Sequence, residues 1–87
     1  MTLNFPNESR SYDARKNRIR FWGYDSALEI SFFIEIGVLH KLAPPKGNAE
    51  DGYLEAFDAA RERIYEVARK VYSRNGRGAY LLAAADF

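Results

Sequence analysis

The sequence predicts an α+β fold, in which a mainly antiparallel sheet of three to four strands carries one short and one long helix packed on one face. Two patterns indicate this class. Residues 48–76 place apolar side chains at alternating steps of three and four, which is the spacing of one helical stripe. Residues 18–22 and 27–34 alternate apolar and polar side chains, as strands with one buried face do. The 87 residues suit a single domain spanning 1–87.

The long helix is the element against which we expect the rest of the chain to pack. Its charged residues lie opposite the apolar stripe, and Glu66 stands four residues before Lys70, the spacing of a helical ion pair. Asn48 is the expected N-cap, and Asn75-Gly76 is the expected stop. The stripe consists of Tyr53, Phe57, Ala60, Ile64, Val67 or Ala68, and Val71.

The two alternating segments flank Gly23-Tyr24-Asp25-Ser26, which has turn chemistry, and so predict an antiparallel hairpin with a four-residue turn. Closing that turn sets Arg20 opposite the Glu29 carboxylate, which is a favourable cross-strand pair. The second strand should then turn its apolar residues toward the helix: Leu28, Ile30, Phe32 and Ile34. The predicted register pairs Trp22 with Ala27, Phe21 with Leu28, Arg20 with Glu29, and Ile19 with Ile30.

The remaining chain predicts smaller elements. Leu3 and Phe5 alternate with polar neighbours before Pro6, which indicates a short edge strand. Residues 7–17 are polar apart from Tyr12, and we expect an ordered loop there. Residues 35–43 predict a short helix that ends before two prolines, and residues 79–84 predict a last strand.

Composition and charge bound the function classes only loosely. The net charge of +1 gives no overall attraction to nucleic acid or to a membrane surface, although residues 23–60 are acidic and both ends are basic. There is no cysteine, hence neither a disulfide framework nor a thiolate site. We find no signal-peptide pattern and no apolar run of membrane length, so we expect a cytoplasmic protein without membrane contact.

The outer face of the predicted sheet is where a contact surface is expected, because it combines cations with aromatic rings. One interpretation is protein association, with a second copy or with another protein, since arginine and aromatic residues are enriched at interfaces. A monomer and a homodimer both remain open. The alternative is a weak nucleic-acid-binding module that stacks bases on the rings. A plainer interpretation is that the arginine stems merely cover Trp22 while Arg20 pairs with Glu29. The candidate contact residues are Arg15, Lys16, Arg18, Arg20, Trp22 and Phe33.

No residue pattern predicts catalysis, a metal site or a cofactor. His40 is the only histidine, so no histidine cluster exists, and an enzyme would require it beside a carboxylate in a pocket. Glu50 and Asp51 are explained by the helix dipole, which favours acidic residues in a first turn. The basic loop at 74–78 lacks the phosphate-binding pattern and follows a helix, where the dipole has the wrong sign for anions.

Residues spread over nearly the whole chain resemble a small bacterial family catalogued as domain of unknown function 1488. The resemblance implies a compact α+β domain of the bacterial cytoplasm and implies no activity. It rests most on the Phe-Trp-Gly-Tyr-Asp and Ala-Phe-Asp sequences. The residues that carry it are Phe5-Pro6, Arg10-Ser11-Tyr12-Asp13, Phe21-Trp22-Gly23-Tyr24-Asp25, Leu39, Ala56-Phe57-Asp58, Arg61, Ile64, Ala68, Tyr72, Tyr80-Leu81-Leu82 and Asp86.

Among these residues, Asp58 and Arg61 stand three apart on the long helix and are placed to pair. One hypothesis is that Tyr12 or Asp13 ties the N-terminal loop to the helix through Arg61. The alternative, which we favour, is ordinary hydrogen bonding that stabilises the fold.

Overall fold

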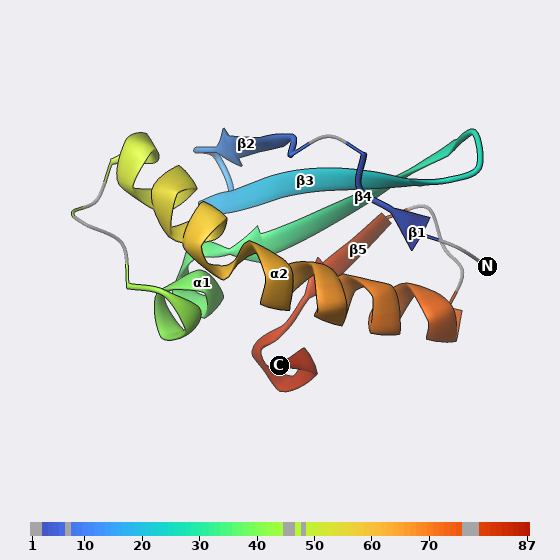
Figure 1. Cartoon of the computed structure of the whole chain (residues 1–87). Helices are drawn as coiled ribbons and strands as arrows, with labels where there is room; N and C mark the ends of the chain where they lie inside the picture. The colour runs from blue at the N-terminus through green and yellow to red at the C-terminus, as the bar shows by residue number, and fades with distance from the viewer. Residues whose placement is uncertain (1–2, 7, 45–46, 48, 76–78) are drawn as a thin grey trace.

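A computed structural model describes residues 3–6, 8–44, 47, 49–75 and 79–87, and it confirms the α+β class (Figure 1). The long helix runs across one face of the sheet, and the short helix follows the sheet's longest hairpin. In chain order the elements are β1 (Leu3–Asn4), β2 (Arg10–Asp13), β3 (Arg18–Asp25), β4 (Leu28–Glu35), α1 (Ile36–Leu42), α2 (Glu50–Asn75), β5 (Ala79–Leu82) and the 3-10 helix η1 (Ala84–Asp86).

The sheet has five strands, one more than the largest number predicted. Its order is β1-β3-β4-β5, and β2 also pairs with β3. All pairings are antiparallel except β4 with β5, which is parallel. The extra strand is β2, which lies inside the predicted loop at 7–17. The prediction was wrong there because Arg10 turns toward the helix and bonds Asp58, so a charged residue occupies a position where the pattern requires an apolar one.

The β3–β4 hairpin exists as predicted, but its turn and register differ. The turn is Ser26-Ala27, and Ser26 has a φ of +56°, as the primed two-residue turns require at that position. Phe21 pairs with Phe32, four residues beyond the predicted Leu28. Because four is even, every side chain keeps its predicted face.

Gly23 explains why the turn prediction failed. It lies within β3, opposite Ile30, and a Cβ there would stand 2.7 Å from the Asn4 carbonyl oxygen and 2.9 Å from the Phe5 ring. The glycine is therefore needed for close approach of the N-terminal segment, and glycine in a strand interior often has this role.

The inner face of the sheet and the stripe of α2 form one core. Phe32 stacks between Phe21 and Tyr80, with ring centroids 5.2 and 5.4 Å apart. Leu28 was predicted to face the helix, but it lies beside the hairpin turn and is 59% exposed. The fully buried large side chains are Phe21, Phe32, Phe57, Ile19, Ile30, Ile34, Leu39, Ile64 and Leu82.

The helices agree with the sequence pattern. The predicted short helix is α1, and α2 carries the expected ion pair, with Lys70 Nζ 3.3 Å from Glu66 Oε1. The predicted cap Asn48 and the stop residue Gly76 lie outside the described residues. No helix within the described ranges is long and apolar enough to cross a bilayer.

The last predicted strand is shorter than expected. β5 ends at Leu82, and the chain turns into η1 because local hydrogen bonds replace strand pairing. The Ala83 amide donates to Asp86 Oδ2 at 2.8 Å, and the Asp86 amide donates to the Ala83 carbonyl at 2.9 Å.

Candidate functional site

The candidate site is the outer face of the sheet, on the side opposite the core. Strand alternation brings Arg18, Arg20 and Trp22 of β3 onto this face together with Phe33 of β4. Register sets Arg20 directly opposite Phe33, and Phe33 in turn opposite Leu81 of β5. The face is therefore crossed by one row that runs from a cation through an aromatic ring to an aliphatic side chain.

Both aromatic rings on this face lie under guanidinium groups. The Arg18 guanidinium carbon is 3.8 Å from the centroid of the Phe33 ring, and that of Arg20 is 4.5 Å from Trp22. All four side chains are half-buried. A planar guanidinium stacks well on a ring because it is weakly hydrated and attracted by the ring quadrupole.

The same two arginines have carboxylate partners, so the charge of the face is balanced. Arg18 Nε lies 3.5 Å from Asp13 Oδ2. Arg20 Nη2 donates to Glu29 Oε2 at 3.1 Å and to Ser31 Oγ at 3.0 Å. The predicted Arg20–Glu29 contact thus forms, although the two residues are not opposite each other: Arg20 reaches Glu29 along β4.

Arg15 and Lys16 were predicted to belong to this site, but the structure does not bring them to the rings. Both lie exposed in the turn between β2 and β3. The Arg15 amide donates to Asp13 Oδ1 at 3.1 Å, which helps to close that turn. Trp22 stands four residues beyond Arg18, or roughly 13 Å along the strand. The face therefore gathers four of the six predicted residues and leaves these two at its end.

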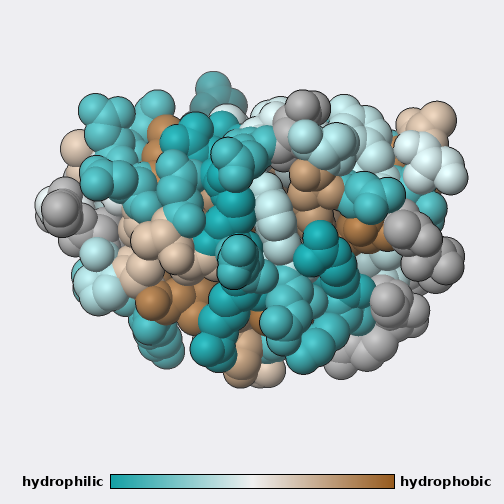
Figure 2. All heavy atoms as spheres, in the orientation of Figure 1, coloured by the Kyte–Doolittle hydropathy of each residue, from teal (hydrophilic) through white to brown (hydrophobic). Residues whose placement is uncertain are grey.

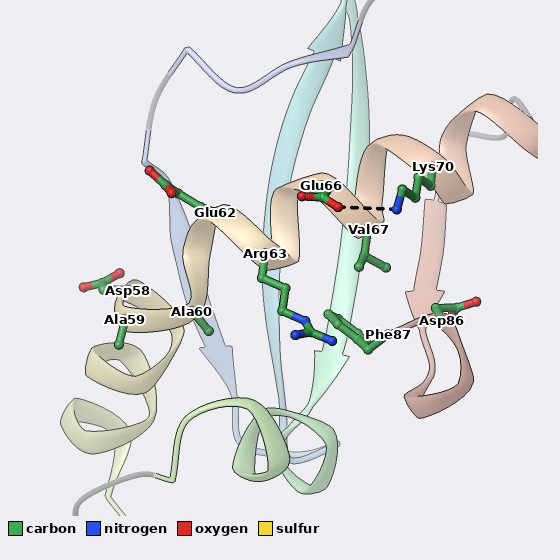
Figure 3. A pocket seen from close by; sticks show the side chains of 10 residues that line it. All are labelled: Asp58, Ala59, Ala60, Glu62, Arg63, Glu66, Val67, Lys70, Asp86 and Phe87. Carbon is green, nitrogen blue, oxygen red and sulfur yellow. Dashed lines mark hydrogen bonds and ion pairs between the residues drawn. The ribbon is translucent and has the colours of Figure 1, made fainter.

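A separate hollow of about 780 Å³ lies on the helical side, between α2 and η1 (Figure 3). Val67 and Phe87 give it apolar walls, and the Glu66–Lys70 ion pair crosses its rim. The surrounding surface on this side is mostly hydrophilic (Figure 2). The lining of the hollow includes both acidic and basic side chains, most of them on the solvent-facing side of α2. These groups do not form a set that would recognise one kind of ligand.

The described residues bring no catalytic or metal-binding arrangement together. His40 lies exposed on α1, and no group of three histidine or carboxylate side chains placed to hold a metal occurs in the described ranges. The structure therefore provides no support for the pocket that the enzymatic interpretation required.

Comparisons with protein families and with solved structures show which family the chain belongs to. Residues 3–82 match the model of a protein family described as "Protein of unknown function (DUF1488)". The chain belongs to the DUF1488 family. It is also similar to a crystal structure of a protein of unknown function from the same family in Shewanella loihica PV-4. The TM-score is 0.82 at 25% identity, over 92% of this chain and 90% of that one. None of the curated proteins matches the chain.

The family assignment confirms the resemblance seen in the sequence, and it carries no activity with it. The Phe-Trp-Gly-Tyr-Asp segment, one of the two on which the resemblance most depends, forms the last five residues of β3. In this DUF1488 chain it supplies Trp22 to the outer face and Gly23 to the close approach of β1.

A cluster of ion pairs ties the N-terminal segment of this DUF1488 chain to α2. Arg61 Nη1 lies 2.9 Å from Glu8 Oε2, and Arg61 also bonds Asp58. Arg10 donates from Nε and Nη2 to the two Asp58 oxygens at 2.9 and 3.0 Å. The predicted Asp58–Arg61 pair is confirmed, and the tie through Arg61 is real.

The hypothesis that Tyr12 or Asp13 makes this tie was wrong. Tyr12 donates its hydroxyl to Asn17 Oδ1 at 2.8 Å, and Asp13 lies beside Arg18. Glu8 contacts Arg61 instead. It was overlooked because it stands in a polar stretch where no pattern distinguishes it.

Leu81 is the member of the outer face that sequence reasoning missed. It is 50% exposed, next to Phe33, while Tyr80 and Leu82 on either side are buried. The alternation at 79–82 does predict a strand, but a parallel partner far back in the chain leaves no trace in local sequence. The alternation therefore located the strand, but it did not show that β4 is the strand with which it pairs.

Two tyrosine hydroxyls lie in the core layer and have shifted pKa values. Tyr72 donates to Asp25 Oδ2 at 2.5 Å, and this hydrogen bond, followed by burial, raises the pKa of Tyr72 to about 12. Burial likewise raises the pKa of Tyr65, which stacks on Phe5 with centroids 3.9 Å apart. Both phenols therefore stay protonated at neutral pH, and neither is poised for proton transfer there.

Proposed function

We propose that this chain is a small, non-enzymatic cytoplasmic protein that acts by binding another protein through the outer face of its sheet. The observation that supports this proposal is the pair of guanidinium–aromatic stacks, Arg18 on Phe33 and Arg20 on Trp22. Tryptophan and arginine are over-represented among the residues that contribute most to protein binding. Here they are already held in place by the fold.

Preorganisation is the physical advantage of this arrangement. Arg20 is fixed by Glu29, Ser31 and Trp22, so little side-chain entropy is left to lose when a partner covers it. The half-buried rings offer apolar area, and the guanidinium edges retain N–H donors. A complementary surface is therefore one that presents carboxylates or carbonyl oxygens around apolar side chains.

The balanced charge favours a protein over a nucleic acid. A phosphate that approached Arg18 or Arg20 would compete with Asp13 or Glu29 and would be repelled by it. Base stacking needs open ring faces, whereas each ring here has a guanidinium over it. Nucleic-acid binding is the second outcome that the experiment must distinguish.

The test is capture from a bacterial extract on the immobilised chain, with two matched charge reversals. Arg20→Glu alters the outer face, and Arg63→Glu alters an exposed arginine on α2. We expect specific protein bands to bind to the wild type and to Arg63→Glu and to be lost with Arg20→Glu, in extract treated with nuclease. Circular dichroism checks that both variants are folded, and Phe33→Ala serves if Arg20→Glu is not.

Two outcomes would overturn the proposal. Bands retained equally by wild type and by both face variants would show that the outer face does not select a protein. Retention of nucleic acid that falls steeply with added salt and disappears with Arg20→Glu would support the alternative function instead.

A further inference from the structure

Strand β5 forms one edge of the sheet. It is the last strand in the order β1-β3-β4-β5, and β4 is its neighbour among the described strands (Figure 1). Its inward side chains, Tyr80 and Leu82, are buried, while Leu81 is 50% exposed and Ala79 is exposed. This edge thus offers a short extended segment with an apolar outer side.

The two edges of the sheet differ in how they are protected. At the other edge, β1 is only two residues long and leads to Pro6, and β2 carries Arg10 and Asp13. Short length, proline and charge are the usual devices that prevent edge strands from pairing with other chains. Residues 79–85 contain no charged residue, no proline and no glycine. The β5 edge therefore lacks the proline and the charged residues of the opposite edge, although its four residues make it no longer than β2.

We propose that β5 pairs antiparallel with the β5 strand of a second copy of this chain, about a two-fold axis, so that the two sheets become continuous. An edge strand that meets its own copy across a two-fold axis is antiparallel to it and self-complementary by symmetry. The junction brings no like charges together, because residues 79–85 have none. On the outer side, the row Arg20–Phe33–Leu81 of one copy meets the same row of the other at the two leucines.

The size of this junction sets its strength. Four residues of strand extend over roughly 14 Å. Such a junction buries less than the ~800 Å² per partner that stable interfaces usually bury. The dimer is therefore reversible and depends on protein concentration. Pairing would also place the outer faces of the two copies on the same side of the joined sheet. Formation of the dimer does not depend on whether that face binds another protein.

The experiment is sedimentation equilibrium from about 10 µM to about 1 mM, the range in which weak specific interfaces associate. We expect the average mass of the wild type to rise toward twice the 10.0 kDa of one chain. Leu81→Lys should remain at the monomer mass. Leu28→Lys is the matched control, since Leu28 is the other large exposed apolar side chain among the described residues, 59% exposed beside the hairpin turn against 50% for Leu81. This variant should associate like the wild type.

Cross-linking tests the geometry of the junction. The chain has no cysteine, so single cysteines can be placed at 79, 81 or 83 without a background. We expect mild oxidation to give a disulfide-linked dimer from at least one of these variants and none from Leu28→Cys. A wild type that stays monomeric throughout, or an equal loss of association with Leu28→Lys, would overturn the proposal.

The same measurement separates this inference from the proposed function. Arg20→Glu should dimerise like the wild type, because Arg20 lies two strands away from the junction. A monomeric wild type whose outer face still captures a protein would reject only the dimer. A dimer that captures nothing would reject only the proposed function.

Discussion

The inner face of the sheet packs rings against rings, whereas the outer face packs rings against guanidinium groups. Phe32 and Phe33 are neighbours in β4 and show the contrast directly. Phe32 is fully buried between Phe21 and Tyr80, and Phe33 is half-buried under the Arg18 guanidinium. The inner arrangement excludes water and stabilises the fold. The outer arrangement holds polar donors and apolar area at the surface, which is what a contact surface requires.

Replacing each of these neighbours by alanine measures how much the two faces differ in their contribution to stability. Phe32→Ala leaves a cavity in the core and should lower the free energy of unfolding by about 3–5 kcal/mol. Phe33→Ala removes a partly exposed cation–π contact and should cost about 1 kcal/mol. Urea unfolding followed by circular dichroism measures both. Equal losses would mean that the two faces do not differ in the way described.

Gly23 tests the inner side of β3, and Gly37 in α1 serves as its control. In Gly23→Ala the new Cβ meets the Asn4 carbonyl at 2.7 Å, and because backbone cannot yield as a side-chain tip can, we expect a loss of about 1–3 kcal/mol. Gly37→Ala is the control: it lies in α1 with nothing within 4 Å, and it should gain about 0.5–1 kcal/mol from helix propensity. Thermal unfolding that ranks the two variants the other way round would contradict the packing of β1 and Phe5 over β3.

The ion pairs at the edge of the core should contribute less to the free energy of unfolding than the packing of the core does. Arg61→Ala removes the contacts with Glu8 and Asp58, and we expect a loss of about 1 kcal/mol, or roughly 4–8 °C in Tm. The matched change Arg63→Ala removes an exposed arginine two residues further along α2 and should leave the Tm nearly unchanged. An unchanged Tm for Arg61→Ala would show that the Arg61 ion pairs do not contribute to holding the N-terminal segment on α2.

The smallest expected change in stability comes from Tyr72 and occurs only at alkaline pH. The hydrogen bond to Asp25 raises the pKa of Tyr72 to about 12 from the ordinary 10.0. The unfolded chain therefore loses this proton first as pH rises. The stability that comes from the protonated phenol is complete below pH 10 and is lost as pH rises from about 10 to about 12. The difference in unfolding free energy between wild type and Tyr72→Phe should shrink over this range, and a constant difference would exclude the Asp25 bond.

The fold could be predicted from the sequence wherever one face of an element is apolar. Periodicity located α2, α1 and the β3–β4 hairpin, and it assigned Arg20 and Trp22 to the outer face. Periodicity did not determine the hairpin register, because a glycine at position 23 is typical of a turn. In the structure Gly23 lies within the strand, and a glycine is needed there because Phe5 packs closely against it. A shift of four residues leaves every face unchanged, so the pattern alone cannot detect it.

The rest of the site depended on contacts between distant parts of the chain. Arg10 in β2 is satisfied by Asp58 on α2, and no local pattern records such a pairing. Leu81 joins the outer face only because β5 pairs in parallel with β4 after the whole of α2 has intervened. Strand alternation therefore placed Arg18, Arg20, Trp22 and Phe33 on one face, whereas Arg15 and Lys16 lie at its end. It located the last strand but not the neighbour with which that strand pairs.

In the function proposed for this chain, the outer face, and not the helical side, contacts the protein partner. Trp22 is the only tryptophan in the chain and lies on that face, so one label reports on it. We would replace it biosynthetically with 5-fluorotryptophan and record its single fluorine NMR resonance while adding the partner fraction eluted from the capture experiment. We expect this resonance to shift or broaden as the partner binds. Binding that leaves this resonance unchanged would show that the partner contacts another face of the protein.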